Sequence, residues 1–210
     1  MTQQDMAAVE TVVGSIARTV LDHEQAFGDL DAVVGDGDFG YSLARGFEKV
    51  LQGWAEFERS SASAFLQQVA VVMTSRIGGT SGPIWGTAFL RAALAIRGRD
   101  ALDSSAAVEM LRAAAEGIKE RGKSDVGDKT LLDALVPATD ALERAAFDGA
   151  TRAEALAVLA SAARSAADAT ARLQARRGRA SYSGERSIGS PDAGAVAVAV
   201  ICERLAADWP

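Results

Sequence analysis

The chain has 210 residues, of which 49% are hydrophobic and 6% aromatic, and its 22 Lys and Arg against 28 Asp and Glu give a formal net charge of −6. This length suits a single domain over residues 1–210 with a substantial core, and the acidic balance disfavours nucleic acid as a main partner, because binding its phosphates needs a basic surface. One cysteine, Cys202, excludes an internal disulfide, and the absence of a signal pattern or a membrane-length apolar run predicts a cytoplasmic protein with no membrane partner.

Apolar residues recur at helical spacing along the chain and predict about eight helices. In chain order we expect helices over residues 5–27, 43–54, 64–75, 84–96, 104–118, 130–146, 152–173 and 193–207. Ser42 and either Ser104 or Ser105 are candidate caps of the second and fifth helices, Gly122 is the expected stop of the fifth, and Pro137 predicts a kink in the sixth.

The last of these segments alternates Ala and Val, which is also compatible with a strand. Every residue in it is apolar, however, and no other part of the chain offers a partner strand, without which a strand is not stable. We therefore predict an all-α fold of antiparallel helices, with no repeat or linker that indicates a second domain.

Three aspartates, Asp31, Asp36 and Asp38, lie in the glycine-rich segment LDAVVGDGDFG between the first two expected helices. Two carboxylates about 4 Å apart repel each other by roughly 4 kcal/mol at an effective dielectric constant near 20, so such crowding needs a cation. Magnesium fits, because it takes oxygen ligands and commonly combines carboxylates with substrate phosphates. The alternative is a solvated acidic turn, since Asp and Gly are common turn residues.

The same segment satisfies the G-x-G-x-x-G pattern of dinucleotide-binding loops through Gly35, Gly37 and Gly40. In that motif backbone N–H groups receive a pyrophosphate directly, and Asp36 and Asp38 would place negative charge where the anion belongs. An EF-hand is also excluded, because Gly40 falls where that loop needs an oxygen ligand. A magnesium ion between carboxylates and phosphate accounts for the loop better than either pattern.

Four glycine-containing segments fall between the expected helices, at residues 35–40, 78–83, 127–130 and 178–182. They follow alternate helices, and alternate loops of an up-and-down bundle share one end. We therefore expect the acidic loop, the Gly/Ser/Thr loop and Arg179 to meet at one rim, a set suited to holding polyphosphate. Taken singly, the second segment is equally compatible with a tight interhelical turn, and Arg179 with a surface ion pair.

These segments, together with Gly86-Thr87 and the run from Gly178 to Gly189, resemble the nucleotide-binding L subunit (DAK2-domain) family of dihydroxyacetone kinases over almost the whole chain. The resemblance implies an eight-helix up-and-down barrel that holds ADP or ATP and two magnesium ions at one rim. It also implies a phosphotransferase (kinase) role in glycerol metabolism.

Carried over by motif position, the magnesium ligands would be Asp31, Asp36 and Asp38. The resemblance implies a nucleotide site made of Phe39, Gly40, Tyr41, Ser42, Thr80, Ser81, Gly122, Leu131, Arg179, Asp192, Ala193 and Gly194. In that site the phosphates would be held by residues 39–42, Thr80 and Ser81. The adenine would lie near Gly122 and Leu131. Arg179 would be the catalytic residue, acting on the transferring group. Three positions depart from common family residues: Phe39 replaces histidine, Ser42 asparagine and Ala193 proline.

In this family a separate K subunit holds the ketone, dihydroxyacetone or a related short ketose. We expect the same here, because the only histidine, His23, lies outside the four segments and no second constellation suits a ketone. One version keeps ADP bound and has it rephosphorylated by a phosphohistidine protein of the phosphotransferase system, and the free-standing length favours this form. The family is also compatible with a homodimer.

Three alternatives stay open. The first is an ATP-consuming kinase subunit for a four-carbon ketose such as erythrulose. The second is the nucleotide domain of a fatty-acid kinase, which is disfavoured because the further long region of that protein is absent here. The third is a nucleotide-sensing regulatory protein that binds ADP and magnesium without catalysis.

Overall fold

A computed structural model describes residues 2–209, and within this range the chain forms nine α-helices, three short 3₁₀ helices and no strand. The all-α prediction is confirmed. The α-helices are α1 (Gln3–Asp22), α2 (Glu24–Ala32), α3 (Phe39–Gln52), α4 (Ala62–Arg76), α5 (Ser81–Ala95), α6 (Ser104–Gly122), α7 (Leu132–Phe147), α8 (Arg152–Ala169) and α9 (Ala193–Asp208). The 3₁₀ helices are η1 (Trp54–Glu56), η2 (Thr170–Arg172) and η3 (Arg179–Ser187).

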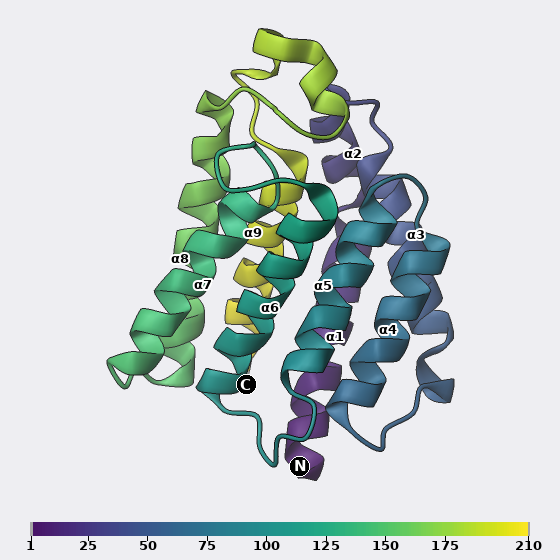
Figure 1. Cartoon of the computed structure of the whole chain (residues 1–210), viewed down its shortest axis with the longest axis vertical. Coiled ribbons are helices and arrows are strands. Elements are labelled where there is room, and N and C mark those ends of the chain that lie inside the picture. Colours follow the sequence, from purple (N-terminus) through teal and green to yellow (C-terminus); the bar gives the residue numbers. More distant parts are fainter. Residues whose placement is uncertain (1, 210) are drawn as a thin grey trace.

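The long helices stand side by side with their axes roughly parallel or antiparallel (Figure 1). Each helix from α3 to α9 packs against the next, and α1 packs against both α9 and α3, so the order of neighbours returns to its start. The closed barrel itself stays a prediction. Within residues 2–209 no helix is both long and apolar enough to cross a bilayer.

Two kinds of core hold the helices together. One side, between α1, α3, α4 and α5, is filled by large side chains such as Phe47, Phe65 and Met73. The other side, between α6, α7, α8 and α9, is lined mostly by alanines, which allow close helix packing. Leu131 packs against both clusters and against a third, smaller one, so it lies where the cores meet.

The expected first helix is in fact two helices, α1 and α2, with a break at His23. The backbone of His23 leaves helical geometry (φ −112°, ψ 13°), and its Nδ1 lies 2.8 Å from the Thr19 carbonyl oxygen. No Gly or Pro marks this position in the sequence, so helical periodicity alone could not reveal the break. As a consequence, α2 is a separate short helix, and it carries Asp31.

Two expected caps were wrong. Ser42 lies inside α3, which starts three residues earlier, and α6 is capped by Asp103, whose side chain accepts the Ala106 N–H at 2.8 Å. Pro137 lies inside α7 as expected. That helix starts at Leu132 instead of residue 130, because residues 127–130 form a separate loop with its own hydrogen bonds.

Candidate metal and nucleotide site

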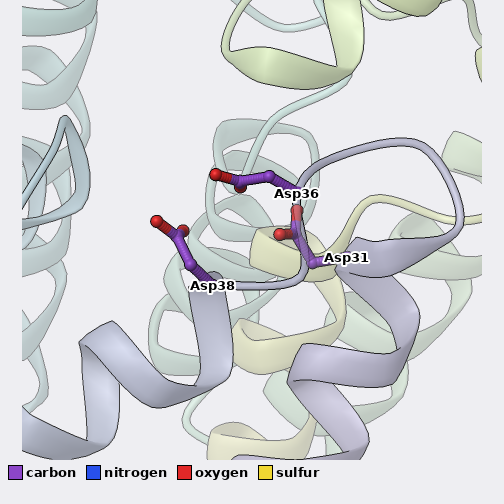
Figure 2. Close-up of side chains that lie close together, drawn as sticks. All are labelled: Asp31, Asp36 and Asp38. Atoms are coloured by element: carbon purple, nitrogen blue, oxygen red, sulfur yellow. The ribbon is translucent and has the colours of Figure 1, made fainter.

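The connection between α2 and α3, which holds the acidic loop, lies at the upper end of the helices in Figure 1. Asp31 lies in the last turn of α2, Asp36 in the connecting loop and Asp38 just before α3. One carboxylate oxygen from each lies within 4.8 Å of the other two, and Figure 2 shows the side chains gathered around one space. The predicted grouping of these carboxylates is therefore present.

Glycines permit this grouping because the acidic loop folds back tightly on Asp31. The Asp31 carbonyl accepts the Gly35 N–H at 2.6 Å, and its carboxylate accepts the Gly37 N–H at 2.9 Å. A Cβ on Gly35 would lie 2.3 Å from Asp31 Oδ1, and Gly37 has a φ of +76°. A side chain at either position would disrupt the turn that brings Asp36 and Asp38 toward Asp31.

Burial raises the pKa of Asp31, and the neighbouring charges of Asp36 and Asp38 raise it further against the hydrogen bonds from Gly37 and Phe39. The cluster therefore resists holding three negative charges without a counter-ion. Three hard carboxylate oxygens at this separation fit the donor preference of Mg²⁺. The side chains present thus suit the metal that the sequence predicts.

Arg179 contacts this cluster, although it is about 140 residues away in the sequence. Its Nη1 is 2.7 Å from Asp36 Oδ2, and its Nη2 is 3.7 Å from Asp38 Oδ2. The Ser183 hydroxyl of the same segment donates to the Val34 carbonyl at 3.0 Å. Arg177 instead pairs with Asp128, so between these two arginines only Arg179 faces the acids.

The Gly/Ser/Thr loop leads into the N-terminus of α5. Thr80 precedes the helix without a side-chain cap bond, and Ser81 is its first residue. Gly78 and Gly79 are exposed, and a Cβ on either would meet no other atom within 4 Å. The first N–H groups of a helix have no partner within it and favour anions. Figure 1 places this loop at the same end as the acidic loop.

The remaining predicted nucleotide residues lie in two places. Asp192 caps α9 by accepting the Ala195 N–H at 2.8 Å, and a Cβ on Gly194 would lie 3.3 Å from Leu131 Cβ. The pKa of Asp192 is raised to about 7, chiefly by burial and also by the charges of Asp133 and Asp31, so Asp192 interacts electrostatically with the acidic loop. Gly122 ends α6, where a Cβ would approach Ile84 of α5 at 3.2 Å.

Two polar residues of this end received no role from the sequence. Lys129 is only 2% exposed and Asp133 only 6%. The Asp133 carboxylate accepts the N–H groups of Gly127 at 2.6 Å and Thr130 at 2.7 Å, which fixes the loop between α6 and α7. The motif Gly127-Asp128-Lys129-Thr130 marked the segment, but the burial of its lysine depends on contacts with residues more than 40 positions away.

Comparison with known proteins gives a consistent result. The sequence model of the DAK2 domain matches residues 33–207. The chain is 40% identical over 177 residues to the ADP-binding subunit of the PEP-dependent dihydroxyacetone kinase of Escherichia coli (strain K12), with 84% of each chain covered. It is 37% identical over 200 residues to the L-erythrulose 1-kinase of Mycolicibacterium smegmatis, covering 94% of this chain and 34% of that protein.

A solved structure shares the fold. The dihydroxyacetone kinase of C. freundii, crystallised in complex with AMP-PNP and Mg²⁺, superposes with a TM-score of 0.77 at 26% identity. The match covers 96% of this chain and 34% of that one. The likeness therefore extends over nearly all of the present chain and about one third of the larger protein.

Proposed function

The chain belongs to the DAK2-domain family, and on that basis we propose that it is the nucleotide- and magnesium-binding subunit of a dihydroxyacetone kinase. In this role it donates a phosphoryl group to dihydroxyacetone, or a related short ketose, held on a separate K subunit. The observation that carries the proposal is the convergence of Asp31, Asp36 and Asp38 opposite Arg179 at one end of the helices.

Each element of this end has a part in the proposed site. The three carboxylates hold Mg²⁺, and bound Mg²⁺ neutralises their charge and that of the nucleotide phosphates. The α5 N-terminus, with Thr80 and Ser81, presents N–H and hydroxyl donors to phosphate oxygens. The start of α3 at residues 39–42 supports the phosphates from below. Gly122 and Leu131 lie near the adenine, and residues 192–194 close the site.

Arg179 supplies positive charge to the transferring phosphoryl group. Its side chain is 59% exposed and stands at the first residue of η3, so it is accessible to a bound phosphate. Charge that develops during phosphoryl transfer is stabilised by such a group, an effect worth orders of magnitude in rate. This is the catalytic role that we propose for it.

The relatives support two routes for the phosphoryl group. The E. coli relative is PEP-dependent, which favours an ADP that stays bound and is rephosphorylated by a phosphohistidine protein of the phosphotransferase system. The M. smegmatis relative is an L-erythrulose kinase, which supports a second candidate, an ATP-consuming subunit for a four-carbon ketose. A purely regulatory nucleotide sensor would share the metal site but would not need Arg179 for any reaction.

Mass spectrometry under native conditions tests the proposal and separates the routes. The chain is purified without added nucleotide but with magnesium. We expect one ADP per chain with accompanying magnesium, as a fixed cofactor requires. A chain that retains no nucleotide, yet binds ATP when it is added, would support the ATP-consuming route. A chain that binds neither ADP nor ATP would contradict the proposed function.

A further inference from the structure

Lys129 is a buried lysine whose ammonium group donates hydrogen bonds to backbone carbonyl oxygens. Its Nζ donates to the carbonyl oxygens of Leu173 at 3.1 Å and Ser190 at 2.7 Å, and to that of Ser187. An ammonium group has three protons, so each proton has one carbonyl acceptor. The arrangement satisfies the group completely although it is almost inaccessible to water.

The three acceptors belong to the two ends of a single segment, residues 173–190, which follows η2 and contains η3. Leu173 lies at its start, and Ser187 and Ser190 lie at its end. Arg179, which reaches the acidic cluster, lies between them. One ammonium group from a different loop thus ties together the two ends of the segment that presents Arg179.

Holding Lys129 in this place is costly for the fold. Burial lowers the pKa of Lys129, although the charge of Asp192 acts in the opposite direction. The residue also has a φ of +62°, which is unfavourable for a side chain other than glycine. Buried charges are often no more stabilising than apolar side chains of similar volume. These costs indicate a role other than general stability.

We propose that Lys129 is a positioning residue, which fixes the ends of the 173–190 segment and thereby holds Arg179 against the acidic cluster. It acts through Arg179 and touches neither nucleotide nor ketone. Asp133 supports this arrangement, because its carboxylate accepts hydrogen bonds from Gly127 and Thr130 and so fixes the loop that carries Lys129. Only the catalytic consequence of this role rests on the proposed function.

Limited trypsin digestion of Lys129→Met tests the clamp itself. The segment contains four arginines, at positions 176, 177, 179 and 186, where trypsin cleaves once the backbone is released. We expect cleavage at these sites, identified by mass spectrometry, to rise about tenfold or more, which corresponds to about 1.4 kcal/mol. Lys49→Met on α3 is the matched control, because Lys49 is exposed and its loss also removes one tryptic site.

A second control separates release of the segment from global destabilisation. Val69→Ala truncates a fully buried side chain of α4 and lowers stability without touching the segment. Unchanged cleavage in folded Lys129→Met, or an equal rise in Val69→Ala, would overturn the proposal. If Lys129→Met does not fold, Asp133→Asn serves instead: loss of one of its two loop hydrogen bonds should give a smaller rise, and no rise would overturn the proposal.

Kinetics with a K-type subunit then test the action through Arg179. Lys129→Met should lower the phosphoryl-transfer rate while leaving ADP affinity little changed. Combined with Arg179→Ala, it should slow the reaction no further than Arg179→Ala alone, because residues that act as one unit are not additive. A double variant slowed by the product of both effects would refute action through Arg179. A wild-type chain that binds no nucleotide would refute the proposed function and leave the digestion result standing.

Discussion

Arg179 and Asp36 form an ion pair at the proposed site. The guanidinium lies 2.7 Å from the Asp36 carboxylate, so the protein provides part of the positive charge that its crowded acids need. Both side chains are partly exposed, and such a pair contributes little to stability. Its significance is therefore in placing a guanidinium beside the proposed metal ligands.

We predict that Arg179→Ala impairs phosphoryl transfer far more than ADP binding. In the proposed site the arginine stabilises charge that develops during transfer, whereas ADP is held mainly through magnesium and the α5 N-terminus. The expected loss in rate is about a hundredfold or more, as for other arginines in phosphoryl transfer. Turnover with a K-type subunit and ADP titration measure the two effects. Arg177→Ala is the control, since Arg177 pairs with Asp128; a wild-type rate for Arg179→Ala would remove its catalytic role.

Asp192 gives the chain a specific pH dependence. Its pKa is about 7 in the folded state against 3.8 ordinarily, so the folded state binds its proton more tightly. This contribution to stability is fully present below about pH 4 and is lost as the pH rises through about 7.

We therefore predict that Asp192→Asn gains stability relative to the wild type as the pH rises. Asn caps a helix as well as Asp but does not ionise, so the cap of α9 is kept. The melting-temperature difference between the variant and the wild type, measured without nucleotide, should be more positive at about pH 8 than at about pH 5 by a few degrees. The same difference at both pH values would show that Asp192 does not titrate in this range.

At the scale of helices, the contact between α2 and α3 sets the spacing of the carboxylates. A Cβ on Gly40 would lie 2.0 Å from the Glu24 carbonyl oxygen and 2.6 Å from the Gly28 nitrogen. The two helices therefore approach with backbone against backbone. Since α2 carries Asp31 and α3 follows Asp38, the separation of the two helices determines how closely these carboxylates meet.

We predict that Gly40→Ala destabilises the protein and weakens magnesium binding together. Forcing the helices apart costs about 1–3 kcal/mol, as overpacking generally does. Thermal melts and titration with magnesium and ADP measure the two consequences. Gly14→Ala on α1 is the matched control, because its Cβ would meet only the end of the flexible Arg18 side chain, at 3.3 Å. Normal magnesium-dependent binding in a folded Gly40→Ala would show that this approach does not set the ligand geometry.

The sequence predicted the helix ends well where glycines stand at them, and less well elsewhere. Periodic apolar residues located all the long helices, and Gly78 and Gly79 before α5 and Gly122 at the end of α6 marked real ends. The break at His23 was missed because it follows from backbone hydrogen bonding at a residue with no turn preference. Ser42 was mistaken for a cap because the helix starts earlier, at Phe39, without a side-chain cap.

At the scale of the whole molecule, the gathering of distant loops at one end could be predicted from the alternation of helices. The structure joins three of these loops directly. Arg179 of the 173–190 segment contacts Asp36 of the acidic loop, and Lys129 of the 127–130 loop contacts Ser190. The buried role of Lys129 could not be predicted, because nothing local distinguishes it from an exposed loop lysine. Its environment exists only after the 127–130 loop meets the 173–190 segment.

We predict that this chain alone does not phosphorylate dihydroxyacetone. The described residues at its rim suit an anion and a metal, and a three-carbon ketone offers few atoms for binding without dedicated polar or covalent capture. A partner that covers the rim would also exclude water during transfer. An assay with ATP, magnesium and dihydroxyacetone should show background rates that rise when a K-type subunit is added. Robust turnover by the isolated chain would contradict the proposal that a separate subunit holds the ketone.

We propose above all that nucleotide and magnesium bind together through the acidic cluster. The most direct test is ADP titration by calorimetry of the nucleotide-stripped wild type, Asp36→Asn and the control Asp29→Asn, whose exposed aspartate lies on α2 outside the cluster. With magnesium, the wild type and Asp29→Asn should bind ADP and lose about tenfold or more in affinity when a chelator is added. Asp36→Asn should stay folded and bind weakly in both conditions. An Asp36→Asn variant with the magnesium-dependent ADP affinity of the wild type would contradict the account.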